Sequence, residues 1–169
     1  MLEKAIDAPG VTYETYDGLL IPGQEEQFDI ITFAGSLYYA KSHALLAEVQ
    51  RVLTSGGHIV IYDFEIDFNP VFEQIGKPPS EHYDHQVNLD DSNFSEFKEK
   101  EEQYTLTFDA SHEELAHLVL SSDLALKFFQ EKYDRKEPFS PLLQEFLQLF
   151  EKSSVSLDAL AYSYLYRVK

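Results

Sequence analysis

The sequence predicts an α/β domain with a mainly parallel sheet, an antiparallel C-terminal strand and helices on both faces. Two nearly continuous apolar runs, Phe28–Ala34 and His58–Phe64, are typical of strands buried on both faces of a parallel sheet. Between them, residues 42–53 carry Leu and Val at the spacing of an amphipathic helix. Strand, helix and strand in this order predict a βαβ unit with a right-handed crossover.

The composition limits the partners that the chain can have. Its 169 residues suit one domain, residues 1–169, and 13 Lys and Arg against 30 Asp and Glu give a net charge of −17. This charge argues against nucleic acid and against an anionic membrane surface, since both are bound by clustered Lys and Arg. The absence of cysteine is compatible with a reducing cytoplasm, where we expect the protein to be.

The residues before the first apolar run predict two short elements and a turn. Leu2 to Ala8 is expected to form a helix that ends at Pro9-Gly10. Val11 to Tyr16 is β-branched and aromatic, which favours a strand. Asp17-Gly18 then supplies turn chemistry.

The βαβ unit is expected to end its helix at Ser55-Gly56-Gly57, a stop signal before the second strand. Residues 65–93 are predicted to be an irregular excursion that covers substrate, because α/β sites form beyond strand ends. The charged segment Phe94 to Phe108 suits an edge strand.

The last third of the chain predicts helices followed by one strand. Ser111 and Glu114 form a capping-box pattern that opens a helix to about Val119. More helix follows to about residue 133, and Pro141 is expected to open another. Leu157 to Val168 is rich in Tyr and Leu and is expected to be an antiparallel strand at the end of the sheet.

The segment FDIITFAGSLYYAKSHALLAEVQRVLTSGGHIVIYDFE resembles the middle of a class I S-adenosylmethionine (SAM)-dependent methyltransferase. In that family the fourth strand begins with Phe-Asp, and a helix then ends in Glu-x-x-Arg-Val-Leu-x-x-Gly-Gly before the fifth strand. TFDASHEELAHLVLSSD and LDALAYSYLYRVK are similar to the C-terminal part of the small-molecule members. The resemblance implies a Rossmann-like methyltransferase sheet, SAM as the methyl donor and a small-molecule substrate.

The chain departs from the family where the donor would be bound. The glycine-rich loop after the first strand is absent, and so is the acidic residue that ends the second strand. MLEKA resembles the helix that follows that second strand. We therefore expect a truncated domain: either the C-terminal part of a methyltransferase or a descendant that has lost SAM binding.

The resemblance places the candidate site residues at two turns. Asp17 and Gly18 match the acidic turn that meets the adenine, although an ordinary Asp-Gly turn explains the same residues. Phe33, Ala34, Gly35 and Ser36 match the end of the fourth strand, beside the methionine end of the donor; the alternative is a plain strand terminus.

Tyr38 and Tyr39 match positions where small-molecule members carry His and then an aromatic residue. Their hydroxyls could orient a substrate or accept a proton, and they are the candidate catalytic residues; the alternative is aromatic cover of the core. His82 and His85 could form a metal cluster with Asp84, but nearby prolines favour a solvated loop. The sequence therefore predicts no metal site.

The missing strands would leave Phe28–Ala34 as an exposed apolar edge, which proteins usually protect. Either Val11–Tyr16 moves beside it, or a second copy pairs there and forms a homodimer. Two functions follow: a SAM-dependent methyltransferase acting on a small molecule, or a non-catalytic dimeric scaffold or binding protein without SAM.

Overall fold

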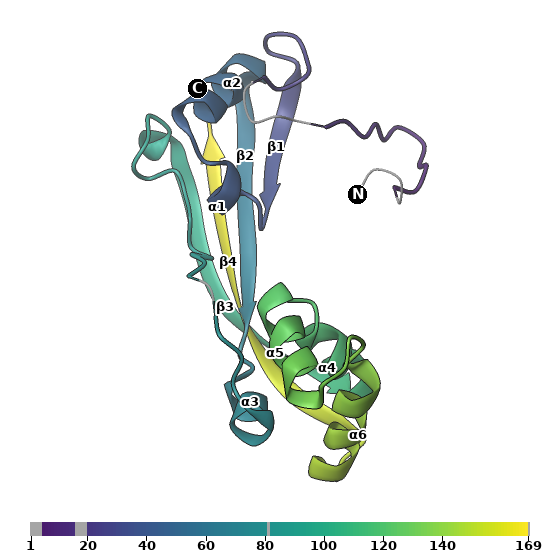
Figure 1. Ribbon diagram of the computed structural model, residues 1–169. Helices are drawn as coiled ribbons and strands as arrows, with labels where there is room; N and C mark the ends of the chain where they lie inside the picture. The colour runs from purple at the N-terminus through teal and green to yellow at the C-terminus, as the bar shows by residue number, and fades with distance from the viewer. Residues whose placement is uncertain (1–4, 16–19, 81, 169) are drawn as a thin grey trace. The chain divides into compact units, whose positions relative to one another are not determined.

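A computed structural model of the chain describes residues 5–15, 20–80 and 82–168 (Figure 1). Its residues form two compact units: Met1–Asp63, Gln86–Glu102 and Ser163–Lys169 make unit 1, while Phe64–His85 and Gln103–Tyr162 make unit 2. The elements, in chain order, are β1 (Phe28–Ala34), α1 (Leu37–Ala40), α2 (His43–Val52), β2 (Leu53–Ile66), α3 (Asn69–Ile75), a 3₁₀ turn (Ser95–Phe97), β3 (Lys98–Ser111), α4 (His112–Val119), α5 (Asp123–Tyr133), α6 (Phe139–Leu149) and β4 (Ser154–Arg167).

The four strands form one sheet in the order β1-β2-β4-β3. β1 and β2 are parallel, with Phe33 opposite Ile61 and Ala34 opposite Tyr62. β4 runs antiparallel to β2, because Gly56 near the start of β2 bonds to Val168, and Asp67, directly after β2, bonds to Asp158. The predicted α/β class, the parallel βαβ unit and the antiparallel direction of the last strand are therefore confirmed, and β3 is an edge strand as expected. The expectation that the last strand ends the sheet is wrong, because β4 lies between β2 and β3.

The core of unit 1 lies between α2 and one face of the β1–β2 pair. The register places Phe33 and Ile61 on this face, where both are buried. Ser42 caps α2 by accepting a hydrogen bond from the Leu45 amide at 3.1 Å, which starts the helix as the sequence predicts. The other buried side chains of α2 include Leu46, Val49 and Val52.

The opposite face of this strand pair is open among the described residues. Ile30 is 60% exposed on β1 and Tyr62 is 47% exposed on β2. The expectation that both apolar runs are buried on two faces is therefore wrong for these strands. An apolar run indicates that a strand could be buried on both faces. Burial also requires a second element that packs on each face, and the run does not predict that element.

A buried tyrosine holds the segment that leads into β3. The Tyr166 hydroxyl accepts a hydrogen bond from the Leu89 amide at 3.1 Å and donates one to Asp90 Oδ1 at 2.9 Å. Asp90 Oδ2 also accepts from Lys98 Nζ at 2.6 Å, and this bond lowers the pKa of Asp90. Burial raises the pKa of Tyr166. Unit 1 thus ties the end of β4 to the start of β3.

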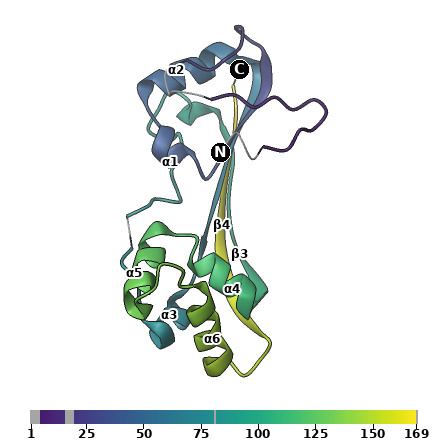
Figure 2. The same ribbon diagram turned by 45° about the vertical axis from the view of Figure 1, so that its right-hand side comes forward.

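Unit 2 has a separate core, built mainly from the later helices (Figure 2). Ser111 and Glu114 form the predicted capping box at the start of α4, with both hydrogen bonds present. Phe129 from α5 and Phe146 from α6 are fully buried in the cluster. Lys132 and Glu145 join α5 to α6 by an ion pair at 2.7 Å. The capping residues and the apolar spacing of these helices, both predicted from the sequence, therefore account for how unit 2 folds.

The N-terminal expectations are wrong where they can be compared with the structure. Residues 5–8 are not helical and residues 11–15 form no strand; the remaining predicted residues lie outside the described ranges. The described part of Val11–Tyr16 therefore does not pair with β1. Val11 is exposed, and a segment with strand propensity gains little without a partner strand and a surface to bury.

Two boundaries and the content of one segment also differ from the prediction. β2 begins at Leu53, directly after α2, and passes through Gly56 and Gly57, which bond to Val168. The excursion over residues 65–93 contains one helix, α3. α6 begins at Phe139, two positions before Pro141, because proline fits the first turn of a helix at more than one position.

Candidate site at the carboxyl end of β1

The turn after β1 is shaped by Gly35. Its φ of +58° is a left-handed conformation that favours glycine, and its amide donates a hydrogen bond to the Tyr62 carbonyl at 2.9 Å. A Cβ added to Gly35 would lie 3.3 Å from Oδ1 of Asp63, the last residue of β2 within unit 1. The turn therefore brings the Asp63 carboxylate against the backbone at the end of β1.

Two exposed tyrosines follow this turn. Ser36 precedes α1, and Leu37, only 2% exposed, anchors the helix in the core. Tyr38 is 37% exposed and Tyr39 is 77% exposed, and their rings meet edge to face with centroids 5.4 Å apart. Tyr39 is therefore mostly open to solvent, whereas Tyr38 is more than half-buried.

The motif residues Glu48 and Arg51 bind the segment that precedes β1. Arg51 forms two hydrogen bonds to the Glu48 carboxylate, at 2.9 and 2.7 Å, and also donates to the carbonyls of Ile21 and Gly23. Glu48 accepts a bond from the Ile21 amide at 3.0 Å. The bond from Arg51 lowers the pKa of Glu48. The pair therefore fixes residues 21–23 at the end of α2, where a planar guanidinium serves several acceptors at once.

We expect Arg51→Lys to lower the thermal midpoint by about 2–4 °C or more, because a lysine amine cannot replace the bidentate bond and both carbonyl contacts together. The lowered pKa of Glu48 also implies that its stabilisation is present above the unfolded pKa and is lost as pH falls through the folded value. Thermal scans at pH 7 and pH 4 would measure both effects. An unchanged midpoint for Arg51→Lys at pH 7 would contradict this role of the pair.

The structure brings some predicted site residues together and leaves others undescribed. Phe33, Ala34, Gly35 and Ser36 all lie at the carboxyl end of β1. Asp17 and Gly18 lie outside the described residues. Asp63 was not predicted, although it lies next to the last residue of the second apolar run. The carboxyl ends of neighbouring parallel strands meet at one edge, and this rule could have found it.

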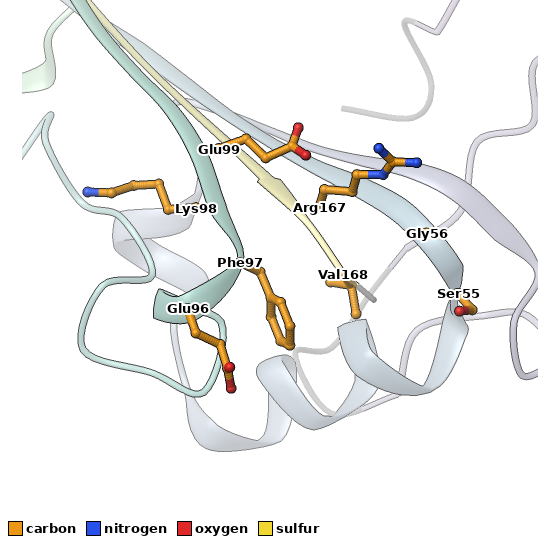
Figure 3. A pocket seen from close by; sticks show the side chains of 8 residues that line it. All are labelled: Ser55, Gly56, Glu96, Phe97, Lys98, Glu99, Arg167 and Val168. Carbon is orange, nitrogen blue, oxygen red and sulfur yellow. The ribbon is translucent and has the colours of Figure 1, made fainter.

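A cavity lies near the start of β2, away from the candidate site (Figure 3). It is an open cavity of about 480 Å³ between the starts of β2 and β3 and the end of β4. Lining residues are Ser55, Gly56, Glu96, Phe97, Lys98, Glu99, Arg167 and Val168. Ligands of parallel sheets bind at the carboxyl ends of the strands, so the predicted reaction is not assigned to this cavity.

Two further features of the described residues bear on the expected partners. No three His, Asp or Glu side chains in residues 5–15, 20–80 and 82–168 are placed to hold a metal ion together. None of the helices that the structure describes combines the length and the apolar character needed to cross a bilayer.

Comparisons with known proteins agree on a methyltransferase resemblance. Residues 1–61 match a family model described as a methyltransferase domain. The fold is similar to that of a putative type II methyltransferase from Anaeromyxobacter dehalogenans, with a TM-score of 0.62 and 10% identity over 99% of this chain and 75% of that chain. A putative methyltransferase from Bacillus halodurans C-125 aligns with 90% of this chain and 69% of its own, at 15% identity and a TM-score of 0.48.

No protein among curated sequences matches the chain. The family match over residues 1–61 agrees with the methyltransferase resemblance that the sequence predicts, and the shared fold agrees with the predicted α/β class. At 10% identity, the structural likeness supports the fold alone.

Proposed function

We propose that the chain is a SAM-dependent methyltransferase, or the C-terminal part of one, and that it acts on a small molecule in the cytoplasm. The observation that carries this proposal is the turn at Gly35. It lies within the matched residues 1–61 and ends the parallel strand at which the family resemblance places the donor. Three further features support the same assignment: the end of β1, the helix α2 and the Glu48–Arg51 pair, which holds the segment before β1.

The residues at the end of β1 fit one part of the donor. Ala34 is exposed and small, and Gly35 has no side chain, so a ligand can approach the backbone closely at this point. The Asp63 carboxylate beside Gly35 suits a positively charged group. When bound, SAM would supply an activated methyl group on a sulfonium, and Phe33, Ala34, Gly35 and Ser36 would hold its methionine end.

Positioning of two reactants can carry much of a methyl transfer, which is an in-line displacement and needs no dedicated metal or nucleophile. The strand-end site is consistent with this requirement, since it offers shape and charge rather than a cluster of catalytic groups. A small-molecule acceptor also agrees with the net charge of −17, which disfavours a nucleic acid.

Formation of S-adenosylhomocysteine would test the proposed activity. The protein would be incubated with SAM and a pooled small-molecule extract, and the product would be quantified by mass spectrometry. We expect formation above the rate of a blank without protein and above that of a Gly35→Val variant, in which a β-branched side chain occupies a left-handed position. A rate equal to the blank would contradict activity of this chain alone.

A non-catalytic dimeric scaffold is the alternative function. It is favoured by the sequence, which contains no Gly-x-Gly-x-Gly loop. It is also favoured by β1, which lies at the edge of the sheet and pairs with β2 alone among the described strands. In this alternative the half-sheet binds a protein or small ligand without SAM.

Both functions include a homodimer through the edge at Phe28–Ala34. Unpaired backbone groups on an edge strand favour pairing with a second chain, and Ile30 adds exposed apolar surface. We expect wild-type protein to sediment at about twice 19.5 kDa and Ile30→Lys at the monomer mass, because a charged side chain opposes edge pairing. Tyr39→Lys, also exposed in unit 1 but outside the β1 strand, is the matched control and should stay dimeric. A monomeric wild type would contradict the interface.

A further inference from the structure

The cavity near the start of β2 lies inside unit 1 and apart from the turn at Gly35. All of its lining residues belong to that unit. Gly56 in the cavity wall and Tyr62 opposite the end of β1 lie on the same strand, β2, which separates the two places by about 20 Å at the usual rise per residue. The cavity volume of about 480 Å³ falls within the range of small-molecule sites, which is about 300–1,000 Å³.

Two opposite charges line this cavity without an ion pair between them. Glu99 on β3 and Arg167 on β4 are both exposed. Neither forms an ion pair with any residue that the structure describes, whereas Lys98 is bound to Asp90 and Glu101. Figure 3 shows the Glu99 and Arg167 side chains extending to the same side, while Lys98 points away from them. The cavity therefore offers a carboxylate and a guanidinium to one bound molecule.

The other side of the cavity is apolar. Phe97 and Val168 are half-buried and extend away from the side that carries Glu99 and Arg167 (Figure 3). Arg167 and Val168 are neighbours at the end of β4, where successive side chains point to opposite faces of the sheet. A molecule in this cavity can therefore contact charge at one end and hydrocarbon at the other.

From this arrangement we infer that the cavity binds a small zwitterion with an apolar body, at a site that takes no part in the proposed methyl transfer. The Arg167 guanidinium suits a carboxylate, which it can bind by two parallel hydrogen bonds, and Glu99 suits a protonated amine. The apolar body would pack against Phe97 and Val168.

Molecules with a single charge fit the same lining less well. A simple anion would gain Arg167 but would be repelled by Glu96, by Glu99 and by the net charge of −17. A simple cation would gain the carboxylates but would face Arg167. A zwitterion gives both kinds of charge a partner, so the lining selects for a molecule that carries both.

Four probes would test the three contacts separately. L-Phenylalanine carries an ammonium, a carboxylate and a ring. 3-Phenylpropionate lacks the ammonium, 2-phenylethylamine lacks the carboxylate, and glycine lacks the ring. Each would be titrated into the full-length protein at pH 7 and followed by the amide signals of the protein in NMR spectra. We expect L-phenylalanine to shift the signals of Gly56, Lys98 and Val168 and to bind at least about tenfold more tightly than each of the others.

Variants assign each contact to a side chain. Arg167→Gln should remove the advantage of L-phenylalanine over 2-phenylethylamine, and Glu99→Gln should remove its advantage over 3-phenylpropionate. Lys100→Gln is the matched control, because Lys100 is an exposed neighbour that pairs with Glu102 and does not line the cavity. This control should bind L-phenylalanine as wild type does.

Two results would overturn the inference. One is the absence of shifts at millimolar L-phenylalanine, or an affinity no higher than that of the three partial probes. The other is competition between L-phenylalanine and S-adenosylhomocysteine, which would place both molecules in one site. We expect saturating S-adenosylhomocysteine to leave the affinity for L-phenylalanine unchanged. A protein that binds L-phenylalanine in this cavity and no S-adenosylhomocysteine would contradict the proposed function alone.

Discussion

Gly35→Ala should weaken the binding of S-adenosylhomocysteine about tenfold or more, because the added methyl group enters the turn that the site depends on. Its Cβ would lie 3.3 Å from Asp63 Oδ1, so the carboxylate must move. The left-handed φ of +58° also costs about 1–2 kcal/mol for a residue with a side chain. Calorimetry would measure affinity, and urea unfolding would measure stability.

Gly56→Ala is the matched control for this change. Gly56 has a φ of +81°, and a Cβ there would meet nothing within 4 Å. The two variants therefore share the backbone cost, and only Gly35→Ala adds a contact at the candidate site. We expect similar losses of stability and a loss of ligand affinity for Gly35→Ala alone. Equal affinities for the two variants would contradict the placement of the ligand at the end of β1.

Phe146→Ala should lower the free energy of unfolding by about 3–5 kcal/mol, because it leaves a cavity in the core of unit 2. The Phe146 side chain is fully buried and its ring centroid is 5.8 Å from that of Phe150. Leu147 is the next residue of α6 and is 53% exposed, so Leu147→Ala should change stability by less than about 0.5 kcal/mol. Urea unfolding followed by circular dichroism would compare them.

A result in which both variants cost the same would show that unit 2 does not pack as described. The helices of this unit would then need another arrangement of their apolar faces. The comparison is informative because the two residues are adjacent in the helix and differ mainly in burial.

Local signals predict α2 and α4 well. Ser42 caps α2 and the Ser111–Glu114 box caps α4, and both depend on residues within one helical turn. The apolar spacing of residues 42–53 identifies the buried side of α2 for the same reason. The order of elements in the βαβ unit also follows from local patterns, since each strand is a short apolar run.

Long-range pairing explains most of what sequence reasoning misses. Val11–Thr15 has strand propensity, but a strand forms only where another strand offers hydrogen bonds and a face to cover. The glycines at 56 and 57 read as a stop, yet Val168 from the far end of the chain pairs with them and continues β2.

The site shows the same limit. Gly35 and Ser36 are visible in the sequence as a strand terminus, whereas the approach of Asp63 depends on the register between β1 and β2. A sequence pattern predicts that both strands exist, but it does not fix which residues are opposite each other. The positions of Tyr38 and Tyr39 likewise require the short helix α1, which the sequence did not indicate.

Calorimetric titration of S-adenosylhomocysteine and SAM into the purified chain tests the central claim most directly, with the mass in solution measured beforehand. The account expects saturable binding at micromolar affinity and competition between the two ligands for one site. An absence of heat at millimolar ligand would contradict a methyltransferase site in this chain and would leave the non-catalytic scaffold as its function.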